Sequence, residues 1–291
     1  MNDNASTVSL SDCALRTISH ARWLPRGIRS RLLYMFRHPD RTPGRRFSVP
    51  FYGLTYKGSL ATYIDWNVFF FGAYEPETLD LFRRILVTMD SPIVADVGAN
   101  VGHHSLYMSQ FAGQVHSFEP WSRVRNQILG HLKDNNIHNV KVHGVALGSQ
   151  NESKTYFAPE GGNTGTGSFL STHATDRNRP SEQLKIVNGD EYFSQNGIDK
   201  LDLLKIDVEG WEWFVLLGLA ETIKRCRPVV VFEYSTSTKD SLHGRSQLNI
   251  LPEYKVFAVG KDIYPVEGEE LPEGNLLLVP AEKTNLLKGL L

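Results

Sequence analysis

The stretch Ile93-Val94-Ala95-Asp96-Val97-Gly98-Ala99-Asn100-Val101-Gly102 decides the fold. The apolar residues 93–97 predict a buried parallel strand. Gly98 and Gly102 predict a turn after it, and residues 103–111 predict the helix that follows. Glycines let a ligand approach the backbone, and a helix N-terminus leaves amide N–H groups free. The stretch therefore predicts a nucleotide-type binding site.

The spacing of the two glycines indicates which ligand this site takes. The pattern here is G-x-x-x-G, whereas dinucleotide folds use G-x-G-x-x-G, whose second glycine admits a pyrophosphate. Asp96 precedes the first glycine, and a carboxylate at that position suits a ligand with positive charge. S-adenosylmethionine carries a sulfonium and an α-amino group. The stretch therefore favours S-adenosylmethionine over a dinucleotide as the cofactor.

A second polar position follows the next predicted strand, residues 114–118. Glu119 comes directly after this strand, and Pro120 removes an N–H and ends it. A carboxylate at the tip of the second strand, about 20 residues after the glycine turn, can accept hydrogen bonds from both ribose hydroxyls. We therefore expect Glu119 to bind the cofactor's ribose; the alternative is a solvated surface glutamate.

The composition bounds the class of protein. At 291 residues the chain is long enough to bury one full α/β domain with residues to spare. The formal net charge of −1 provides no global field for nucleic acid, so no nucleic-acid partner is expected. Two cysteines, Cys13 and Cys226, form no disulfide framework and fit a reducing cytoplasmic setting. Residues 1–12 are polar, which argues against a secretory signal, and no apolar run approaches the ~18 residues of a membrane span.

Residues 16–46 differ from the rest of the chain because they hold nine arginines and a single acid, Asp40. Apolar residues alternate with these arginines, and their spacing from Ile28 to Phe36 is helical. A basic amphipathic helix of this kind can lie on an anionic membrane surface or contact a polyanionic glycan carrier. The alternative is an arm packed against the domain or against a second subunit. We expect a basic, partly helical arm over residues 1–46 and one domain over residues 47–291.

The rest of the chain alternates predicted strands and helices, which predicts a doubly wound, mostly parallel sheet. Predicted strands near 254–259 and 276–279 close the sheet as an antiparallel pair. Ligands sit at the carboxyl ends of the strands in such sheets. Asp96, Glu119, Asp207 and Glu233 all fall at such ends. The glycine-rich residues 161–167 predict a flexible loop, either a lid over the acceptor site or a plain surface loop.

Five motifs in order resemble the FkbM-type family of S-adenosylmethionine-dependent methyltransferases. They are Gly72-Ala73-Tyr74-Glu75-Pro76-Glu77, Asp96 to Gly102, Ser117-Phe118-Glu119-Pro120, Ala146-Leu147-Gly148 and Lys205-Ile206-Asp207-Val208-Glu209-Gly210-Trp211-Glu212. The resemblance covers residues 63–234. It implies a class I, Rossmann-like methyltransferase fold and transfer of a methyl group, usually to a hydroxyl oxygen of a sugar, glycan or secondary metabolite. The positions implied for cofactor binding are Asp96, Gly98, Asn100, Gly102, His103, Glu119 and Ala146.

Methyl transfer requires that donor and acceptor be held in line, and an aliphatic hydroxyl must also lose its proton. Asp207 and Glu209 flank the end of a buried strand near the expected methyl position, and Glu233 or Glu212 can support them. We expect Asp207, Glu209 and Glu233 to form the catalytic group. Alternatively, Asp207 caps the following helix and Glu212 faces solvent. No dedicated metal site is predicted, although Asp207 and Glu233 have the oxygen ligands that Mg²⁺ prefers.

Two other classes of function remain compatible with these residues. Glu119 also suits the ribose of NAD, so a nicotinamide-dependent oxidoreductase on the same sheet is one alternative. The glycine spacing counts against it. The second alternative is a non-catalytic module that binds the donor and is tethered through the Arg-rich arm.

Overall fold

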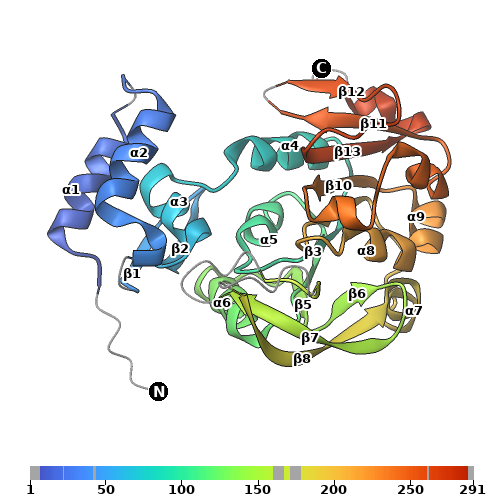
Figure 1. The fold of residues 1–291 in the computed structure, drawn as a ribbon, viewed down its shortest axis with the longest axis horizontal. Helices are drawn as coiled ribbons and strands as arrows, with labels where there is room; N and C mark the ends of the chain where they lie inside the picture. The colour runs from blue at the N-terminus through green and yellow to red at the C-terminus, as the bar shows by residue number, and fades with distance from the viewer. Residues whose placement is uncertain are drawn as a thin grey trace.

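The computed structural model describes residues 7–21, 23–41, 44–159, 167–170, 178–260 and 262–287 (Figure 1). The helices are α1 (Leu10–Ser19), α2 (Arg26–Arg37), α3 (Tyr63–Phe71), α4 (Pro76–Leu86), α5 (His103–Met108), α6 (Ser122–Asp134), α7 (Gly189–Gln195), α8 (Glu212–Gly218) and α9 (Ala220–Cys226). The strands are β1 (Arg46–Phe51), β2 (Leu54–Ser59), β3 (Ile93–Val97), β4 (Gln114–Phe118), β5 (Val140–His143), β6 (Ala146–Gly148), β7 (Glu152–Pro159), β8 (Asn178–Asn188), β9 (Leu203–Ile206), β10 (Val229–Tyr234), β11 (Tyr254–Val259), β12 (Ile263–Pro265) and β13 (Gly274–Pro280).

An eight-stranded sheet forms the centre of the molecule, in the order β12-β11-β13-β10-β9-β3-β4-β5. The five neighbouring strands β5, β4, β3, β9 and β10 run parallel, and β13 pairs antiparallel with both β10 and β11. The chain leaves β3 toward β5 on one side and later crosses to β9 and β10 on the other. This reversal beside β3 is where ligands bind in open α/β sheets.

Apolar side chains on both faces explain why the central strands form. In β3, Val94 packs in a cluster with α4, α5 and α6, whereas Ala95 and Val97 pack in a cluster with α7, α8 and α9. Strands that are buried on both faces need near-continuous apolar sequence, and residues 93–97 provide it except at Asp96. The predicted α/β fold with a mostly parallel sheet and an antiparallel closing pair is therefore confirmed.

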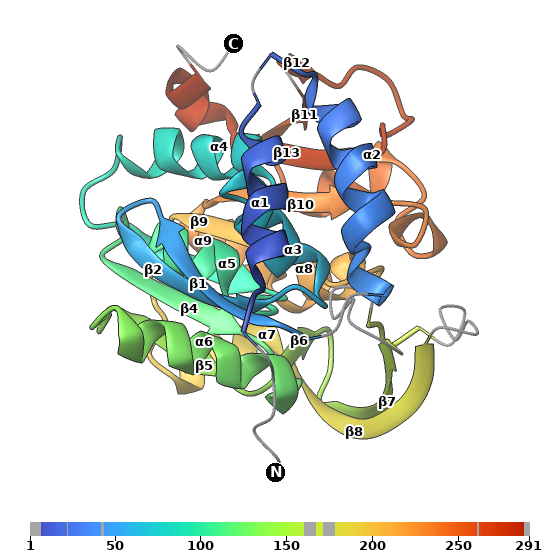
Figure 2. The same ribbon diagram turned by 90° about the vertical axis from the view of Figure 1, so that its left-hand side faces the viewer.

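A third apolar cluster holds the N-terminal elements together. It joins Leu33 of α2 with the β1–β2 hairpin, α3, and Leu79, Leu106 and Tyr107 of α4 and α5. Figures 1 and 2 show α1 and α2 lying outside α3 at the end of the molecule that is coloured blue. The predicted helix across residues 28–36 is confirmed as part of α2. The sequence pattern did not separate α3 from the hairpin, because residues 63–71 are apolar on all sides and therefore lack helical periodicity.

A three-stranded sheet, β6-β8-β7, covers the lower edge of the body in Figure 1. The segment 140–148 has an apolar pattern that suggests one strand, but it divides at Gly144. Residues before it continue the central sheet as β5, and residues after it pair with β8 as β6. Within the described part of the chain, no helix combines the length and apolar character that a membrane crossing needs.

Candidate active site

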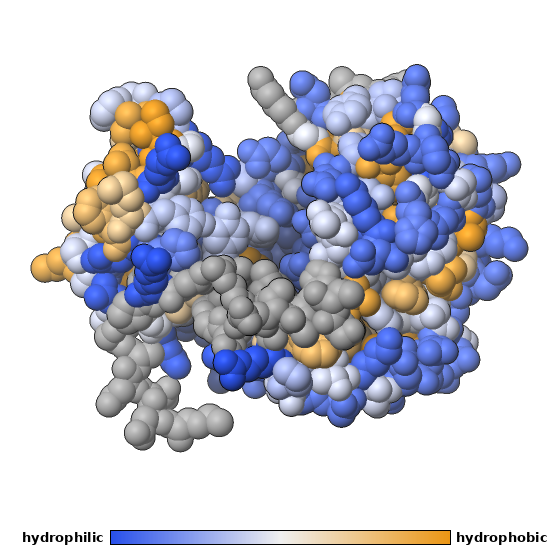
Figure 3. Space-filling view, in the orientation of Figure 1, coloured by the Kyte–Doolittle hydropathy of each residue, from blue (hydrophilic) through white to orange (hydrophobic). Residues whose placement is uncertain are grey.

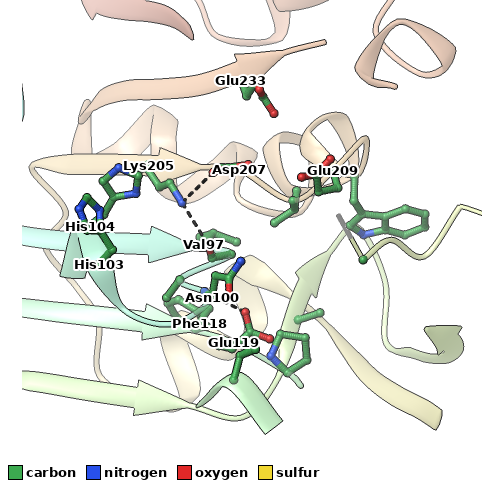
Figure 4. A pocket seen from close by; sticks show the side chains of 18 of the residues that line it. Val97, Asn100, His103, His104, Phe118, Glu119, Lys205, Asp207, Glu209 and Glu233 are labelled. Atoms are coloured by element: carbon green, nitrogen blue, oxygen red, sulfur yellow. Dashed lines mark hydrogen bonds and ion pairs between the residues drawn. The ribbon is translucent and has the colours of Figure 1, made fainter. Parts of the chain in front are cut away.

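A cavity of about 290 Å³ opens at the carboxyl ends of β3, β4, β9 and β10. One wall comes from the end of β4 and from β6, including Phe118, Glu119 and Ala146. The opposite wall carries carboxylates from the ends of β9 and β10, and Figure 4 shows Asp207, Glu209 and Glu233 on the side away from Glu119. The sheet therefore brings the predicted cofactor position and the predicted catalytic group to a single cavity.

The glycine turn is held by the protein itself. The N–H groups of Gly98 and Ala99 both donate to the carbonyl of Phe118, and the N–H of Gly102 donates to the carbonyl of Ala99. We expected these amides to face a ligand, but they are already satisfied. The turn instead fixes Asn100, which lies at a left-handed φ of 50° and lines the cavity.

Gly98 is needed for a contact within the protein. Val97 pairs with Ile206 in parallel register, so Gly98 comes level with Asp207. A Cβ on Gly98 would lie 1.9 Å from the carbonyl oxygen of Asp207, and its φ of 79° also disfavours other residues. Gly102 has a φ of 82°, packs against Ile128 and does not line the cavity. Gly98 lines the cavity, Gly102 lies behind it, and both positions let neighbouring segments pack closely.

Glu119 is nearly buried, and its two carboxylate oxygens are held by backbone donors. The N–H of Asn100 donates to Oε2 at 2.9 Å (Figure 4), and the N–H of Trp121 donates to Oε1 at 2.8 Å. Burial raises the pKa of Glu119 to about 7, against the lowering effect of these two bonds. A carboxylate has about four acceptor positions, so two remain for hydroxyl groups in the cavity.

Asp96 lies behind the cavity wall. It is fully buried, and it pairs with Lys205 Nζ at 3.1 Å and accepts a hydrogen bond from Ser105. Lys205 also donates to the carbonyl of Gly98 and pairs with Asp207 at 3.4 Å. Burial alone lowers the pKa of Lys205, but Asp96 and Asp207 outweigh it, so the pKa stands above its ordinary value. Asp96 therefore fixes Lys205, and Lys205 is the residue that reaches the cavity.

Two carboxyl groups of the opposite wall, Glu209 and Glu233, have raised pKa values. Burial raises the pKa of Glu209 to about 9, and the charges of Asp207 and Glu233 add to this effect. Burial likewise raises the pKa of Glu233 to about 7, with contributions from Asp207, Glu212 and Glu75. Like charges in a poorly solvated site disfavour ionisation. Glu209 and Glu233 therefore hold their protons to higher pH than solvent-exposed glutamates do.

Glu212 shapes this wall without lining the cavity. It is fully buried, its Oε1 accepts from the N–H groups of Val208 and Gly210, and its Oε2 accepts from the hydroxyl of Thr238. The expectation that Glu212 faces solvent is therefore wrong. These bonds hold the turn in which Glu209 adopts a left-handed φ of 52°, a strained conformation of the kind that persists where the surrounding structure imposes it.

His103 and His104 both line the cavity, and burial lowers the pKa of each well below its ordinary value. Nε2 of His103 accepts from the N–H of Tyr74 at 3.3 Å, and Nε2 of His104 lies 3.6 Å from Glu75. Both rings are therefore neutral. Within the described residues, no group of three or more His, Cys, Asp and Glu side chains is arranged to hold a metal ion, so the possible Mg²⁺ site receives no support.

Reasoning from individual sequence positions missed three residues that the fold brings to the cavity: Lys205, Tyr74 and Glu75. Lys205 interrupts an otherwise apolar strand, which is a recognisable signal of a buried ion pair. Tyr74 and Glu75 lie in the turn between α3 and α4 and line the cavity. Glu75 adopts a left-handed φ of 45° directly before Pro76. The glycine-rich residues 161–166 lie outside the described residues, and Gly167 lines the cavity.

A sequence profile of the methyltransferase FkbM domain matches residues 96–250, more than half of the chain. The match starts at Asp96, includes Glu119, Lys205, Asp207 and Glu233, and so spans both walls of the cavity. The chain belongs to the FkbM methyltransferase family.

Two curated relatives extend the comparison for this FkbM-family chain. The AMB antimetabolite synthetase AmbE of Pseudomonas aeruginosa is 27% identical over an alignment of 184 residues; the match covers 51% of this chain and 9% of AmbE. Methyltransferase 1 of Beauveria bassiana is 26% identical over an alignment of 187 residues; the match covers 58% of this chain and 74% of that protein. The chain thus matches a small part of one relative and most of the other.

Two solved structures align with part of the chain. The methyltransferase FkbM from Methylobacillus flagellatus aligns with 17% identity and a TM-score of 0.43, over 73% of this chain and 52% of that one. SMU.1697c from Streptococcus mutans, in complex with SAH, aligns with 12% identity and a TM-score of 0.41, over 69% of this chain and 96% of that one.

Proposed function

We propose that this protein transfers a methyl group from S-adenosylmethionine to a hydroxyl of a sugar, glycan or small secondary metabolite. The observation that carries the proposal is the two-sided cavity. One wall presents a carboxylate held for two hydroxyls, and the other presents carboxyl groups whose pKa values suit proton transfer at neutral pH. Membership of the FkbM family supports methyl transfer over the nicotinamide-dependent alternative.

The residues of the first wall fit the cofactor. Glu119 has free acceptor positions for ribose hydroxyls, and Phe118, Ala146 and Leu147 beside it form an apolar surface that suits a planar base. Asn100 completes this part of the wall. S-adenosylmethionine, when bound, supplies a methyl group on a sulfonium and so needs no further activation by the protein.

The residues of the second wall differ in their readiness to accept a proton. Glu209, with a pKa of about 9, holds its proton at pH 7. Asp207 is engaged by Lys205. Glu233 has a pKa of about 7, and a general base is most effective when its pKa lies near the working pH. We assign Glu233 as the base that takes the acceptor's hydroxyl proton, while Asp207 and Glu209 bind and orient that hydroxyl.

The test is methyl transfer from S-adenosylmethionine with a labelled methyl group to matched sets of three acceptors. Each set contains a hydroxylated sugar or metabolite, the same compound with one hydroxyl removed, and the same compound with an amine in place of that hydroxyl. We expect label in the hydroxyl member alone, as a methyl ether. Transfer only to the amine would overturn the oxygen specificity. Binding of NAD without binding of S-adenosylmethionine would overturn the proposal as a whole.

A further inference from the structure

The molecule exposes a group of large apolar side chains at its N-terminal end. Trp23, Ile28, Met35 and Phe36 are 81%, 49%, 73% and 58% exposed, and we call these four residues the α2 face. Figure 3 shows hydrophobic residues gathered at the end of the molecule that α1 and α2 form. Single exposed apolar residues are common on proteins, but a group of this size marks an interaction surface.

The α2 face has a fixed orientation. Ile28, Met35 and Phe36 follow the spacing of one helix face, and Leu33 on the other side is fully buried against the hairpin and α3. Arg37 is the last residue of α2, and its carbonyl accepts a hydrogen bond from Trp66 Nε1 at 2.6 Å. The side chain of Arg37 pairs with the buried Asp12 of α1. The helix is therefore anchored along one side, and its α2 face is exposed to solvent.

The charge around this face is strongly positive. Residues 16–46 hold nine arginines and one acid, so 22 basic and 31 acidic residues remain elsewhere out of chain totals of 31 and 32. Within α2 there are four arginines and no acidic residue. Arg31 lies among the apolar residues of the α2 face and is exposed, whereas Arg26 at the start of the helix lies over the ring of Phe71 and pairs with Glu77 at 3.8 Å. The surface is thus apolar and cationic, while the remainder of the chain is acidic.

We propose that the α2 face docks the protein on an anionic lipid bilayer, with α2 lying along the membrane surface. Trp23, Met35 and Phe36 enter the boundary between headgroups and acyl chains, and Arg31 contacts lipid phosphates. A helix of 12 residues, ~18 Å long, with exposed bulky side chains and an exposed arginine among them suits this plane. A protein partner would require a complementary groove, and nothing in the charge pattern calls for one.

The experiment is co-sedimentation of the full chain with vesicles of phosphatidylcholine alone and of phosphatidylcholine mixed with phosphatidylglycerol. We expect roughly tenfold tighter partitioning to the anionic vesicles, since each basic residue near the surface adds to the attraction. Raised salt should weaken this partitioning. Quenching by brominated lipids should reach Trp23, because Trp66, Trp121 and Trp211 are buried and Trp213 is half-buried in α8.

The double variant M35E/F36E tests the face directly, and V87E/L129E is its matched control because Val87 and Leu129 are 57% and 49% exposed elsewhere. We expect M35E/F36E to partition to the vesicles about tenfold or more weakly, because two apolar side chains that enter the bilayer are lost. We expect the control to bind like the wild type. Circular dichroism checks that both variants fold. The proposal is overturned if the wild type ignores anionic vesicles or if the two variants bind equally. It is also overturned if M35E/F36E only converts a dimer to a monomer, since the α2 face would then be a subunit contact.

Discussion

The two walls of the cavity hold carboxylates in opposite ways. Glu119 receives one backbone N–H on each oxygen, so the fold of the chain fixes its position whether or not a ligand is present. Asp207, Glu209 and Glu233 instead face one another, and Lys205 is the cation that they share with the buried Asp96. The first arrangement suits recognition, because its geometry is fixed in advance. The second suits proton transfer, because small changes in charge move its pKa values.

The largest effect is expected from Glu233→Gln, which keeps the shape of the side chain and removes the base. We expect kcat to fall by about 10²- to 10⁴-fold, as is usual when a general base is lost, with donor affinity unchanged. Rates of methyl transfer to the best of the hydroxylated acceptors measure this change. The exposed Glu267→Gln is the matched control. A loss of less than about threefold would be incompatible with Glu233 as the base.

The pH profile of the wild type sharpens the same point. Because Glu233 must be ionised to accept a proton, kcat/KM should rise with pH through an apparent pKa of about 7. The variant Glu233→Gln should lose this rise. The carboxylates act together, so the profile reports the cluster, and Asp207→Asn should shift the midpoint downward by removing a neighbouring negative charge.

The next effect concerns the ion pair behind the two walls. Lys205→Met leaves Asp96 buried without its cation, and we expect a loss of about 3–5 kcal/mol in the free energy of unfolding. The double variant with Asp96→Asn should regain most of that loss. Urea unfolding measures both. Lys200→Met removes the exposed pair with Asp202 and should change the free energy of unfolding by less than about 1 kcal/mol. Equal effects of the two lysine variants would contradict the assignment of Lys205.

The smallest of these predicted effects is on the pH dependence of the free energy of unfolding. The pKa of Glu209 is raised in the folded state to about 9 from an ordinary 4.5, so the folded chain keeps a proton that the unfolded chain releases. Its contribution to stability is thus most favourable below pH 4.5 and falls as pH rises toward 9. Glu209→Gln should be more stable than the wild type by about 1–3 kcal/mol at pH 7, and by little at pH 5. A stability difference between Glu209→Gln and the wild type that increases toward low pH would contradict this account. Glu191→Gln, at an exposed position, serves as the control.

Periodicity and turn chemistry predicted the parts of the fold that depend on local sequence. The bounds of β3 and β4 agree with the apolar runs at 93–97 and 114–118 because both strands are buried on two faces. The predicted wall residues Glu119, Asp207, Glu209 and Glu233 do line one cavity, since strand ends meet at one edge of a sheet.

Properties that depend on neighbours distant in sequence were not predictable. Asp96 looks like a ligand for the cofactor until its distance to Lys205, 109 residues later, is known. Gly98 lines the cavity, and the register of β3 and β9 adds a second requirement for glycine, because it places Asp207 where a Cβ would lie. Glu212 combines local bonds to Val208 and Gly210 with a bond to Thr238, 26 residues later. For Asp96 and Gly98 a contact distant in sequence decides, and the residues next to them do not report it.

The central claim is that the wall around Glu119 binds S-adenosylmethionine through its ribose. Calorimetric titration of S-adenosylmethionine, its demethylated product and NAD into the wild type and Glu119→Ala tests this most directly. We predict that both methyl-cycle ligands bind, that NAD does not, and that the variant binds about ten- to a hundredfold more weakly, as expected for lost hydrogen bonds to a charged group. Glu191→Ala should bind like the wild type. Unchanged affinity in Glu119→Ala, or binding of NAD in place of S-adenosylmethionine, would contradict the account.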